Sequence, residues 1–192
     1  RRFLAIEPTQ GKKNNMEYEI KELISQSQIA SRVKALGDEI RERYKETDEL
    51  VIVGLLRGAF VFLADLAREM NRPSQIDFMT TSSYGSGMES ARNVRIVKDL
   101  EDDIHQRDVL LVDDIVDTGH TLQKVSEVLN SRNPRSLSIC VLLDKPSRRE
   151  RVVNIDWVGF SIPDTFVIGY GIDYAGAHRE LPYIGEVVKT TD

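Results

Sequence analysis

The sequence predicts an α/β fold with a mostly parallel central sheet flanked by helices. Continuous apolar runs alternate with a helical pattern, most clearly over 108–115, 121–132 and 136–143. Strands that are apolar along their whole length are typical of parallel sheets, because helices cover both faces of such a sheet. Carboxylates and small residues directly follow the run at 108–115. Ligands bind beyond the carboxyl ends of parallel strands, so we expect the functional site at that edge.

The composition predicts one globular domain over 1–192, with about 1–15 as a tail outside the fold. The chain has 192 residues, 41% hydrophobic and 30% charged, which is enough to bury a sizeable core. Its apolar runs are far shorter than the roughly 20 residues of a membrane helix. The first residues also lack the apolar core of a signal peptide. We therefore expect a cytoplasmic protein without a membrane partner.

Charge and cysteine content narrow the function classes. The chain carries 26 basic and 31 acidic residues, a net charge of −5, which disfavours a nucleic-acid partner. Cys140 is the single cysteine and lies in an apolar run, so we expect a buried, inert thiol in a reducing compartment. The locally basic stretch 145–153 is interpreted as a solvated loop, with a phosphate or subunit contact as the alternative.

Residue periodicity defines the elements in order. Apolar residues at helical spacing over 28–46 predict an amphipathic helix; they are Ile29, Val33, Leu36, Ile40 and Tyr44. A strand ending at Gly54, a loop and a second helix follow within 49–70. Two strands at 75–84 and 94–100 then flank small polar residues, which predicts a mobile loop over 84–93.

The second half continues the alternation of strands and helices. Apolar residues on one helical face over 121–132 predict a helix between the strands 108–115 and 136–143. Further strands are expected at 157–162 and 166–170.

The stretch "VLLVDDIVDTGHTL" combines two kinds of binding chemistry. Asp113 and Asp114 place adjacent carboxylates at the end of a strand, where they suit a vicinal diol or a divalent cation held together with a diol. Thr118, Gly119 and Thr121 precede or open a helix, whose first N–H groups and dipole attract an anion. Together these features predict a site for a ribose 5-phosphate.

Two other interpretations of this stretch remain open. Asp117 and Thr118 could simply cap the helix while Asp113 and Asp114 are solvated. A receiver-type signalling domain also has an acidic pair after a strand, but that pair comes near the start of its fold. Here a strand, a helix and a hairpin precede the pair, which disfavours a receiver domain.

The same stretch resembles the phosphoribosyl-pyrophosphate signature of the type I phosphoribosyltransferases. Four further segments resemble the 6-oxopurine salvage enzymes of that family, the bacterial hypoxanthine phosphoribosyltransferases: "VGLLRGAFVFLADL", "DFMTTSSYGSG", "LLDKPSRR" and "FVIGYGIDYAGAHRELPYIG". The resemblance runs from about Ile29 to Ile184 with all motifs in the family's order. It implies the phosphoribosyltransferase fold, with a small hood built from the N-terminal segment and about 163–192.

The resemblance implies transfer of a phosphoribosyl group from 5-phosphoribosyl 1-pyrophosphate to hypoxanthine, and to guanine, with release of pyrophosphate. Mg²⁺ is the implied cofactor, and a homodimer or homotetramer the implied assembly. Within the signature, Asp113 and Asp114 match the acidic pair that holds the ribose hydroxyls and magnesium, and Asp117 matches the general base near the purine N7. The matching 5-phosphate loop comprises Thr118, Gly119, His120 and Thr121, with the His120 ring expected to face solvent.

The remaining motifs match other parts of the family's site. The pyrophosphate contacts correspond to Leu56, Arg57, Gly58 and Arg179, with a cis peptide between Leu56 and Arg57. The purine contacts correspond to Lys145, Phe166, Val167 and Ile172, with Lys145 donating to the 6-oxo group. Ser83 and Tyr84 begin the implied lid, and Asp173 matches a further carboxylate associated with magnesium. His178, next to Arg179, is expected at the surface.

One departure and two rival functions remain. Many relatives have Glu then Asp where this chain has Asp113 then Asp114, which leaves the contact of Asp113 with ribose or metal either direct or through water. A regulator on the same fold would need a basic RNA-facing surface or a DNA-binding domain, and the sequence has neither. An enzyme that prefers xanthine is poorly separated by sequence.

Overall fold

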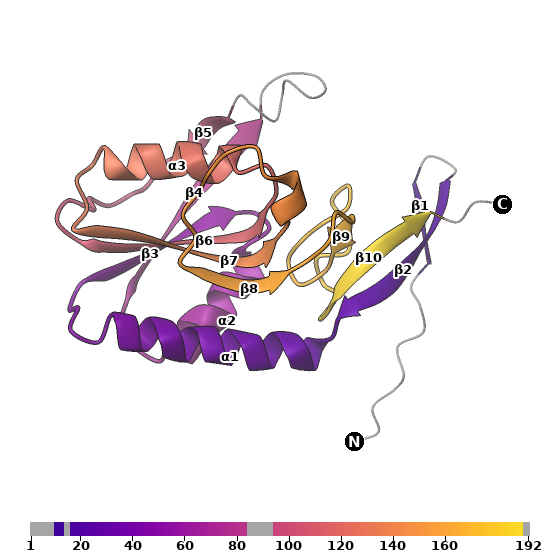
Figure 1. Cartoon of the computed structure of the whole chain (residues 1–192), viewed down its shortest axis with the longest axis horizontal. Helices are drawn as coiled ribbons and strands as arrows, with labels where there is room; N and C mark the ends of the chain where they lie inside the picture. Colours follow the sequence, from indigo (N-terminus) through magenta and orange to yellow (C-terminus); the bar gives the residue numbers. More distant parts are fainter. Residues whose placement is uncertain (1–9, 14–15, 84–93, 190–192) are drawn as a thin grey trace.

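The central sheet contains six strands in the order β5-β4-β3-β6-β7-β8 (Figure 1). The computed structural model describes residues 10–13, 16–83 and 94–189. All neighbouring pairs in this sheet are parallel except the edge pair of β4 and β5. The strands are β3 (Leu50–Leu56), β4 (Gln75–Ser83), β5 (Val94–Lys98), β6 (Asp108–Val116), β7 (Ser136–Asp144) and β8 (Trp157–Ser161). The predicted fold class is confirmed.

Helices cover both faces of this sheet, which explains why its inner strands β3, β6 and β7 are mostly apolar. Helices α1 (Gln26–Arg43) and α2 (Phe60–Met70) lie on one face, and α3 (His120–Asn130) lies on the other (Figure 1). Side chains alternate along β3, so Leu50 and Ile52 join the core under α1 and α2, whereas Val51 and Val53 join the core under α3. The apolar stripe predicted for the first helix is buried along α1.

A smaller antiparallel sheet stands beside the central sheet, in the order β1-β2-β10-β9 (Figure 1). Its strands are β1 (Gln10–Lys13), β2 (Met16–Ile24), β9 (Val167–Ile168) and β10 (Ile184–Lys189). β2 leads directly into α1, where Ser25 caps the helix together with Gln28. The sheet thus joins the two ends of the chain, as the implied hood requires. Gln10–Lys13, within the expected tail, is a strand.

Some peripheral features differ from the prediction, and others lie outside the described residues. β2 and β10 were not predicted as strands, although apolar and charged residues alternate strictly over Met16–Lys21 in β2, which was a usable signal. Tyr84 and the predicted mobile loop 84–93 lie outside the described residues. Cys140 is buried in β7, and burial raises the pKa of its thiol, as expected for an inert cysteine. No helix in the described part of the chain is long and apolar enough to cross a membrane.

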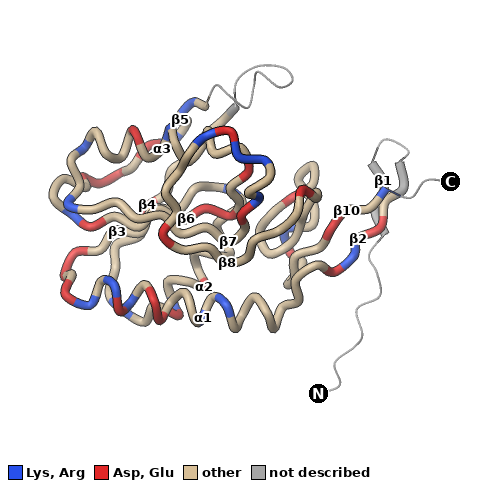
Figure 2. The backbone as a smooth tube through the Cα atoms, viewed as in Figure 1, with Lys and Arg blue, Asp and Glu red and all other residues tan. Residues whose placement is uncertain are grey.

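Lys and Arg positions are interspersed with Asp and Glu positions along the backbone rather than separated by sign (Figure 2). On α1, for example, Arg32 pairs with Glu39 at 2.9 Å, and Asp38 pairs with Arg41 at 2.5 Å. Such exposed pairs each contribute at most about 1 kcal/mol to stability.

Asp108, at the start of β6, anchors the edge of the sheet opposite the predicted site. Its buried carboxylate accepts hydrogen bonds from Arg135 at 2.6 Å, Ser136 at 2.6 Å and Thr47 at 2.7 Å. The bond from Arg135 is the main reason why the pKa of Asp108 lies well below its usual range. The charged form of this carboxylate therefore stabilises the fold.

We predict that Asp108→Asn lowers the free energy of unfolding at pH 7 by about 2 kcal/mol, because the amide loses its charge-assisted bonds. The folded-state pKa is depressed, so the contribution is present above the unfolded value of about 4 and disappears as the pH falls through the folded value. Urea denaturation from pH 7 to pH 2 checks this. A stability difference that stays constant over that range would contradict the assignment.

Candidate functional site

A polar cavity of about 540 Å³ opens at the carboxyl edge of the central sheet. It lies between the loop after β3, the loop after β6 and a segment of the hood. Ten of the predicted site residues line it: Leu56, Arg57, Gly58, Asp113, Asp114, Asp117, Thr118, Gly119, Thr121 and Asp173. Residues from three distant parts of the chain therefore meet where the sheet topology predicts a ligand.

Asp113 and Asp114 form an adjacent carboxylate pair within β6, which extends to Val116. Asp113 is buried and Asp114 is partly buried. An Asp113 carboxylate oxygen accepts a hydrogen bond from the Asp114 backbone N–H at 2.9 Å, and Asp114 accepts one from Ile115 at 3.0 Å. Burial, and then the neighbouring Asp114 carboxyl, raise the pKa of Asp113 well above its usual range. Burial also raises the pKa of Asp114. The pair is thus an electrostatically costly group, and the solvated alternative is wrong.

Gly58 lies directly against the Asp114 carboxylate. A Cβ atom at position 58 would overlap Oδ2 of Asp114, so only glycine leaves this carboxylate in place. The preceding peptide between Leu56 and Arg57 is cis, as the resemblance implied. The loop after β3 and the acidic pair are therefore packed together as one unit.

Two helices begin at this cavity without a capping side chain. α2 follows Ala59 and α3 follows Gly119, and neither cap residue makes a side-chain bond to its helix. Neither first turn contains an acidic residue. The free N–H groups and the helix dipoles make both ends suitable for an anion. The interpretation of Asp117 and Thr118 as mere helix caps is therefore wrong.

The loop after β7 supports the loop 117–121 from behind. Backbone N–H groups of Glu150 and Arg151 both donate to the Thr118 carbonyl, at 2.9 and 3.0 Å. Gly119 has φ +90°, and a Cβ there would lie 2.8 Å from the Arg151 carbonyl oxygen. A glycine is required by both the conformation and the close contact.

His120 differs from the expectation that its ring faces solvent. The ring is buried, with Nε2 3.0 Å from a Glu150 carboxylate oxygen and Nδ1 3.4 Å from Arg151 Nε. The carboxylate and guanidinium come from the loop after β7, whose position next to α3 cannot be read from the local pattern. His120 thus fastens this loop to the start of α3.

Most of the basic stretch 145–153 is exposed, as expected of a solvated loop, but two of its arginines contact the loop 117–121. Arg148 Nε donates to Asp117 Oδ1 at 3.0 Å, and Arg149 Nε donates to the Asp117 carbonyl at 3.1 Å. Arg149 also pairs with Asp144 at the end of β7. The adjacent Lys145 is buried, and its N–H donates to Val116 at 3.0 Å. Arg148 and Arg149 were not among the predicted site residues, although they closely follow Lys145, which was predicted to contact the purine.

The hood supplies the remaining predicted residues. Phe166, immediately before β9, is 52% exposed, and its ring centroid lies 5.2 Å from that of Tyr174. Val167 and Ile172 are buried in the main core. Asp173 pairs with Arg179 at 2.7 Å, and Arg179 also donates to the Gly171 carbonyl at 2.6 Å. His178, expected at the surface, is partly buried, with Nε2 2.8 Å from the Tyr18 hydroxyl.

The cavity's carboxylates suit a hard cation only together with a ligand. Among the described residues, no three His, Cys, Asp or Glu side chains are grouped closely enough to hold a metal ion by themselves. Asp173 is occupied by Arg179, which leaves the pair Asp113 and Asp114. Mg²⁺ commonly uses one or two protein carboxylates plus substrate oxygens and water, so this donor set fits a magnesium ion carried by a substrate.

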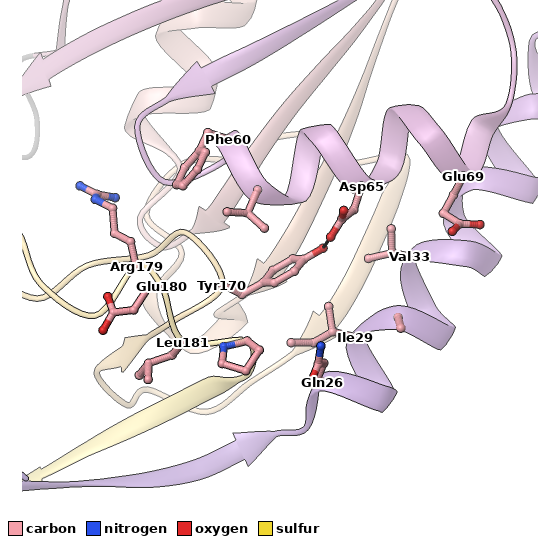
Figure 3. Close-up of a pocket in the computed structure, with 13 residues that line it drawn as sticks. Gln26, Ile29, Val33, Phe60, Asp65, Glu69, Tyr170, Arg179, Glu180 and Leu181 are labelled. Carbon is pink, nitrogen blue, oxygen red and sulfur yellow. Dashed lines mark hydrogen bonds between the residues drawn. The ribbon is translucent and has the colours of Figure 1, made fainter. Parts of the chain in front are cut away.

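A second hollow, of about 630 Å³, lies between α1, α2 and the hood segment 179–182 (Figure 3). Its walls are mainly apolar, with Ile29, Val33 and Phe60 facing Leu181. Inside it, the Tyr170 hydroxyl donates to Asp65 at 2.5 Å. This hollow is larger than the polar cavity, and Arg179, a predicted pyrophosphate contact, lines it. The acidic pair and the loop 117–121, however, line the polar cavity. The polar cavity is therefore the candidate site.

We predict that Gly58→Ala weakens binding of ribose 5-phosphate tenfold or more, roughly the loss of one hydrogen bond to a charged group. The added methyl displaces the Asp114 carboxylate, which is the free end of a side chain, so the thermal unfolding midpoint should change little. Calorimetric titration and thermal denaturation measure the two effects. Unchanged affinity would show that Asp114 does not depend on this contact.

The comparisons with known proteins agree with this geometry. A model of the phosphoribosyl transferase domain matches residues 19–175. Hypoxanthine phosphoribosyltransferase of Salmonella typhimurium is 57% identical over 174 residues, covering 90% of this chain and 98% of the relative. Hypoxanthine-guanine phosphoribosyltransferase of Mycobacterium tuberculosis is 48% identical over 168 residues, covering 85% and 83%.

Solved structures give the same result. A hypoxanthine-guanine phosphoribosyltransferase of Bacillus anthracis superposes with a TM-score of 0.82 at 40% identity, covering 89% of this chain and 99% of that chain. A hypoxanthine phosphoribosyltransferase of Staphylococcus aureus gives 0.83 at 43% identity, covering 88% and 91%. The chain therefore belongs to the phosphoribosyltransferase family, as a member of its hypoxanthine phosphoribosyltransferase group.

Proposed function

We propose that this enzyme transfers the 5-phosphoribosyl group of 5-phosphoribosyl 1-pyrophosphate to N9 of hypoxanthine, and of guanine, in purine salvage. The names of its relatives support this activity. The observation that carries it most is the convergence of the carboxylate pair Asp113 and Asp114 with the uncapped start of α3 in one cavity. Carboxylates accept from a diol and a helix N-terminus attracts a phosphate, so one cavity matches both ends of a ribose 5-phosphate.

Each part of the sugar phosphate has a proposed partner. Asp113 and Asp114 hold the ribose hydroxyls. The 5-phosphate lies against the loop Thr118, Gly119, His120 and Thr121, where His120 contributes only its backbone N–H because its ring faces Glu150. The pyrophosphate lies against Leu56, Arg57 and Gly58 at the start of α2, with Arg179 nearby. Arg57 supplies the positive charge that a polyanion needs on this side.

Mg²⁺ is the proposed cofactor, entering with the pyrophosphate substrate. The chemistry of the donor set supports it, because Asp113 and Asp114 offer hard oxygen ligands, and Asp173 would join them by exchanging its partner Arg179 for the ion. When bound, the ion would neutralise charge on the departing pyrophosphate. It would also offset the cost of burying the acidic pair.

The reaction forms the bond from N9 to C1′ of ribose and breaks the bond from C1′ to pyrophosphate, which leaves with the electron pair. Its transition state resembles an oxocarbenium ion, so the protein has to stabilise separated charges rather than supply a nucleophile. We assign the general base to Asp117, which would accept the purine N7 proton while its charge faces the ribosyl cation. Ser83, Tyr84 and the loop after them would form the lid that excludes water.

The purine ring is proposed to lie between Lys145 and the hood. Lys145 would donate to the 6-oxo group, Phe166 would stack on the ring, and Val167 and Ile172 would bound its edge. The 52% exposure of Phe166 supports stacking, since a large aromatic side chain remains available to a ligand. An ammonium group cannot accept from the 6-amino group of adenine, which gives Lys145 a role in selectivity.

The same proposal implies a compartment, a set of partners and an assembly for the enzyme. We place it in the cytoplasm, without nucleic-acid or membrane partners, and as a homodimer or homotetramer; sedimentation velocity distinguishes the two assemblies.

The direct test of the function is a substrate panel. The protein is incubated with 5-phosphoribosyl 1-pyrophosphate, Mg²⁺ and one of hypoxanthine, guanine, xanthine or adenine, and the nucleotides are separated by chromatography. We expect nucleotide from hypoxanthine and guanine and none from adenine. Product from xanthine alone would replace the substrate assignment, and no product from any base would contradict the proposed function.

We predict that Asp117→Asn lowers turnover by about 10² to 10⁴, because an amide cannot accept the N7 proton. Affinity for 5-phosphoribosyl 1-pyrophosphate should change much less, since that ligand contacts other residues. Steady-state kinetics with hypoxanthine separates the two quantities. Turnover near that of the unmodified enzyme would remove Asp117 from the chemistry.

We further predict that Lys145→Ala weakens the selection against adenine, because the pocket loses the donor that matches an oxo group. The ratio of kcat/KM for hypoxanthine to that for adenine measures the selection. If this ratio is unchanged, another residue reads the 6-position.

A further inference from the structure

Arg148 makes a specific contact with the proposed general base. Its Nε donates to Asp117 Oδ1 at 3.0 Å, and its Nη1 lies 3.6 Å from an Asp164 carboxylate oxygen. The side chains of Arg148 and Asp117 are each about half exposed, at 47% and 41%. The contact is a directed hydrogen bond from the planar guanidinium to one carboxylate oxygen, and a second carboxylate lies beside the same guanidinium.

The backbone fixes the position from which Arg148 reaches Asp117. Pro146–Arg148 form a single 3₁₀ turn directly after Lys145, and the Arg148 N–H donates to the Lys145 carbonyl at 3.1 Å. Lys145 in turn donates its N–H to Val116, the residue before Asp117. The turn that begins at the purine-binding lysine therefore places Arg148 beside the base.

Two neighbouring arginines hold different atoms of Asp117. Arg148 donates to the carboxylate, whereas Arg149 donates to the backbone carbonyl at 3.1 Å. Among the described residues, the hydrogen bond to the Asp117 carboxylate is the one that Arg148 donates to Oδ1. Oδ2 therefore remains available to a purine. The Asp117 carboxylate also raises the pKa of Arg148, so this partner stays charged.

We propose that Arg148 is a positioning residue for the transfer reaction: it orients Asp117 so that Oδ2 meets the N7 proton of the purine. This inference rests on the proposed function, in which Asp117 is the base. Without Arg148, the half-exposed carboxylate of Asp117 rotates freely, and a displacement of about 1 Å can cost a factor of up to 10² in rate.

Asp164 gives the contact a second consequence. It lies two residues before Phe166, so Arg148 connects the loop after β6 to the segment that carries the stacking ring. Orientation of the base and closure of the purine pocket are thereby linked through one guanidinium group.

A double-mutant cycle tests the proposal. Kinetics with hypoxanthine are measured for the unmodified enzyme, Arg148→Gln, Asp117→Asn and the double variant. Arg148→Gln should lower kcat at least tenfold and change the KM for 5-phosphoribosyl 1-pyrophosphate less than about twofold. In the Asp117→Asn enzyme, the same substitution should lower kcat less than about twofold, because the carboxylate that Arg148 orients is already gone.

The control variant is Arg132→Gln. It removes an arginine that pairs with Asp99, far from the site, and should leave kcat unchanged. If Arg148→Gln lowers kcat equally with and without the Asp117 carboxylate, or not at all, the positioning role is wrong. If the unmodified enzyme makes no nucleotide, the proposed function fails instead, independently of Arg148.

Discussion

The burial of one carboxylate directly beside a second is the constraint on which the rest of the site depends. Asp113 and Asp114 lie in β6 between β3 and β7; Asp113 is buried there, and its burial together with the neighbouring Asp114 carboxyl raises the pKa of Asp113 well above its usual range. A protein keeps such a costly group only where something else compensates for it. In the proposed function, a ribose diol and a cation would provide that compensation when they bind.

The surrounding loops are arranged around this pair. Gly58 brings the loop after β3 against Asp114, and the strands β3 and β6 that carry them are hydrogen-bonded neighbours. On the other side of β6, the loop after β7 fastens the loop 117–121 through His120 and through the Thr118 carbonyl. The three loops thus form one connected unit, in which a change in one loop alters the geometry of the next.

Sequence reasoning succeeded where local patterns determine the structure. Apolar runs specified the parallel strands, and the residues of the acidic stretch line one cavity, because strand, loop and helix follow one another along the chain. Within the hood, the strand predicted at 166–170 contains β9, whereas β2 and β10 were missed. Their pairing joins segments 160 residues apart, which a local pattern does not reveal.

The environments of individual side chains were less predictable. His120 and Arg148 had been assigned to solvent, yet each bonds to a residue about 30 positions away, His120 to Glu150 and Arg148 to Asp117. Such contacts depend on the order of strands β6 and β7, which the chain fixes only after folding. Phe166 is the opposite case. It lies in an apolar stretch, which usually indicates a core position, yet its side chain is half exposed.

We expect a nucleotide to bind at the carboxyl edge of the sheet, across the three loops that surround Asp113 and Asp114. A crystal structure of the enzyme with its product, inosine 5′-monophosphate, tests it most directly. In that structure, the phosphate should lie against the loop 118–121, the ribose hydroxyls should contact Asp113 and Asp114, and the purine should lie between Lys145 and Phe166. A nucleotide bound instead in the apolar hollow between α1 and α2 would contradict it.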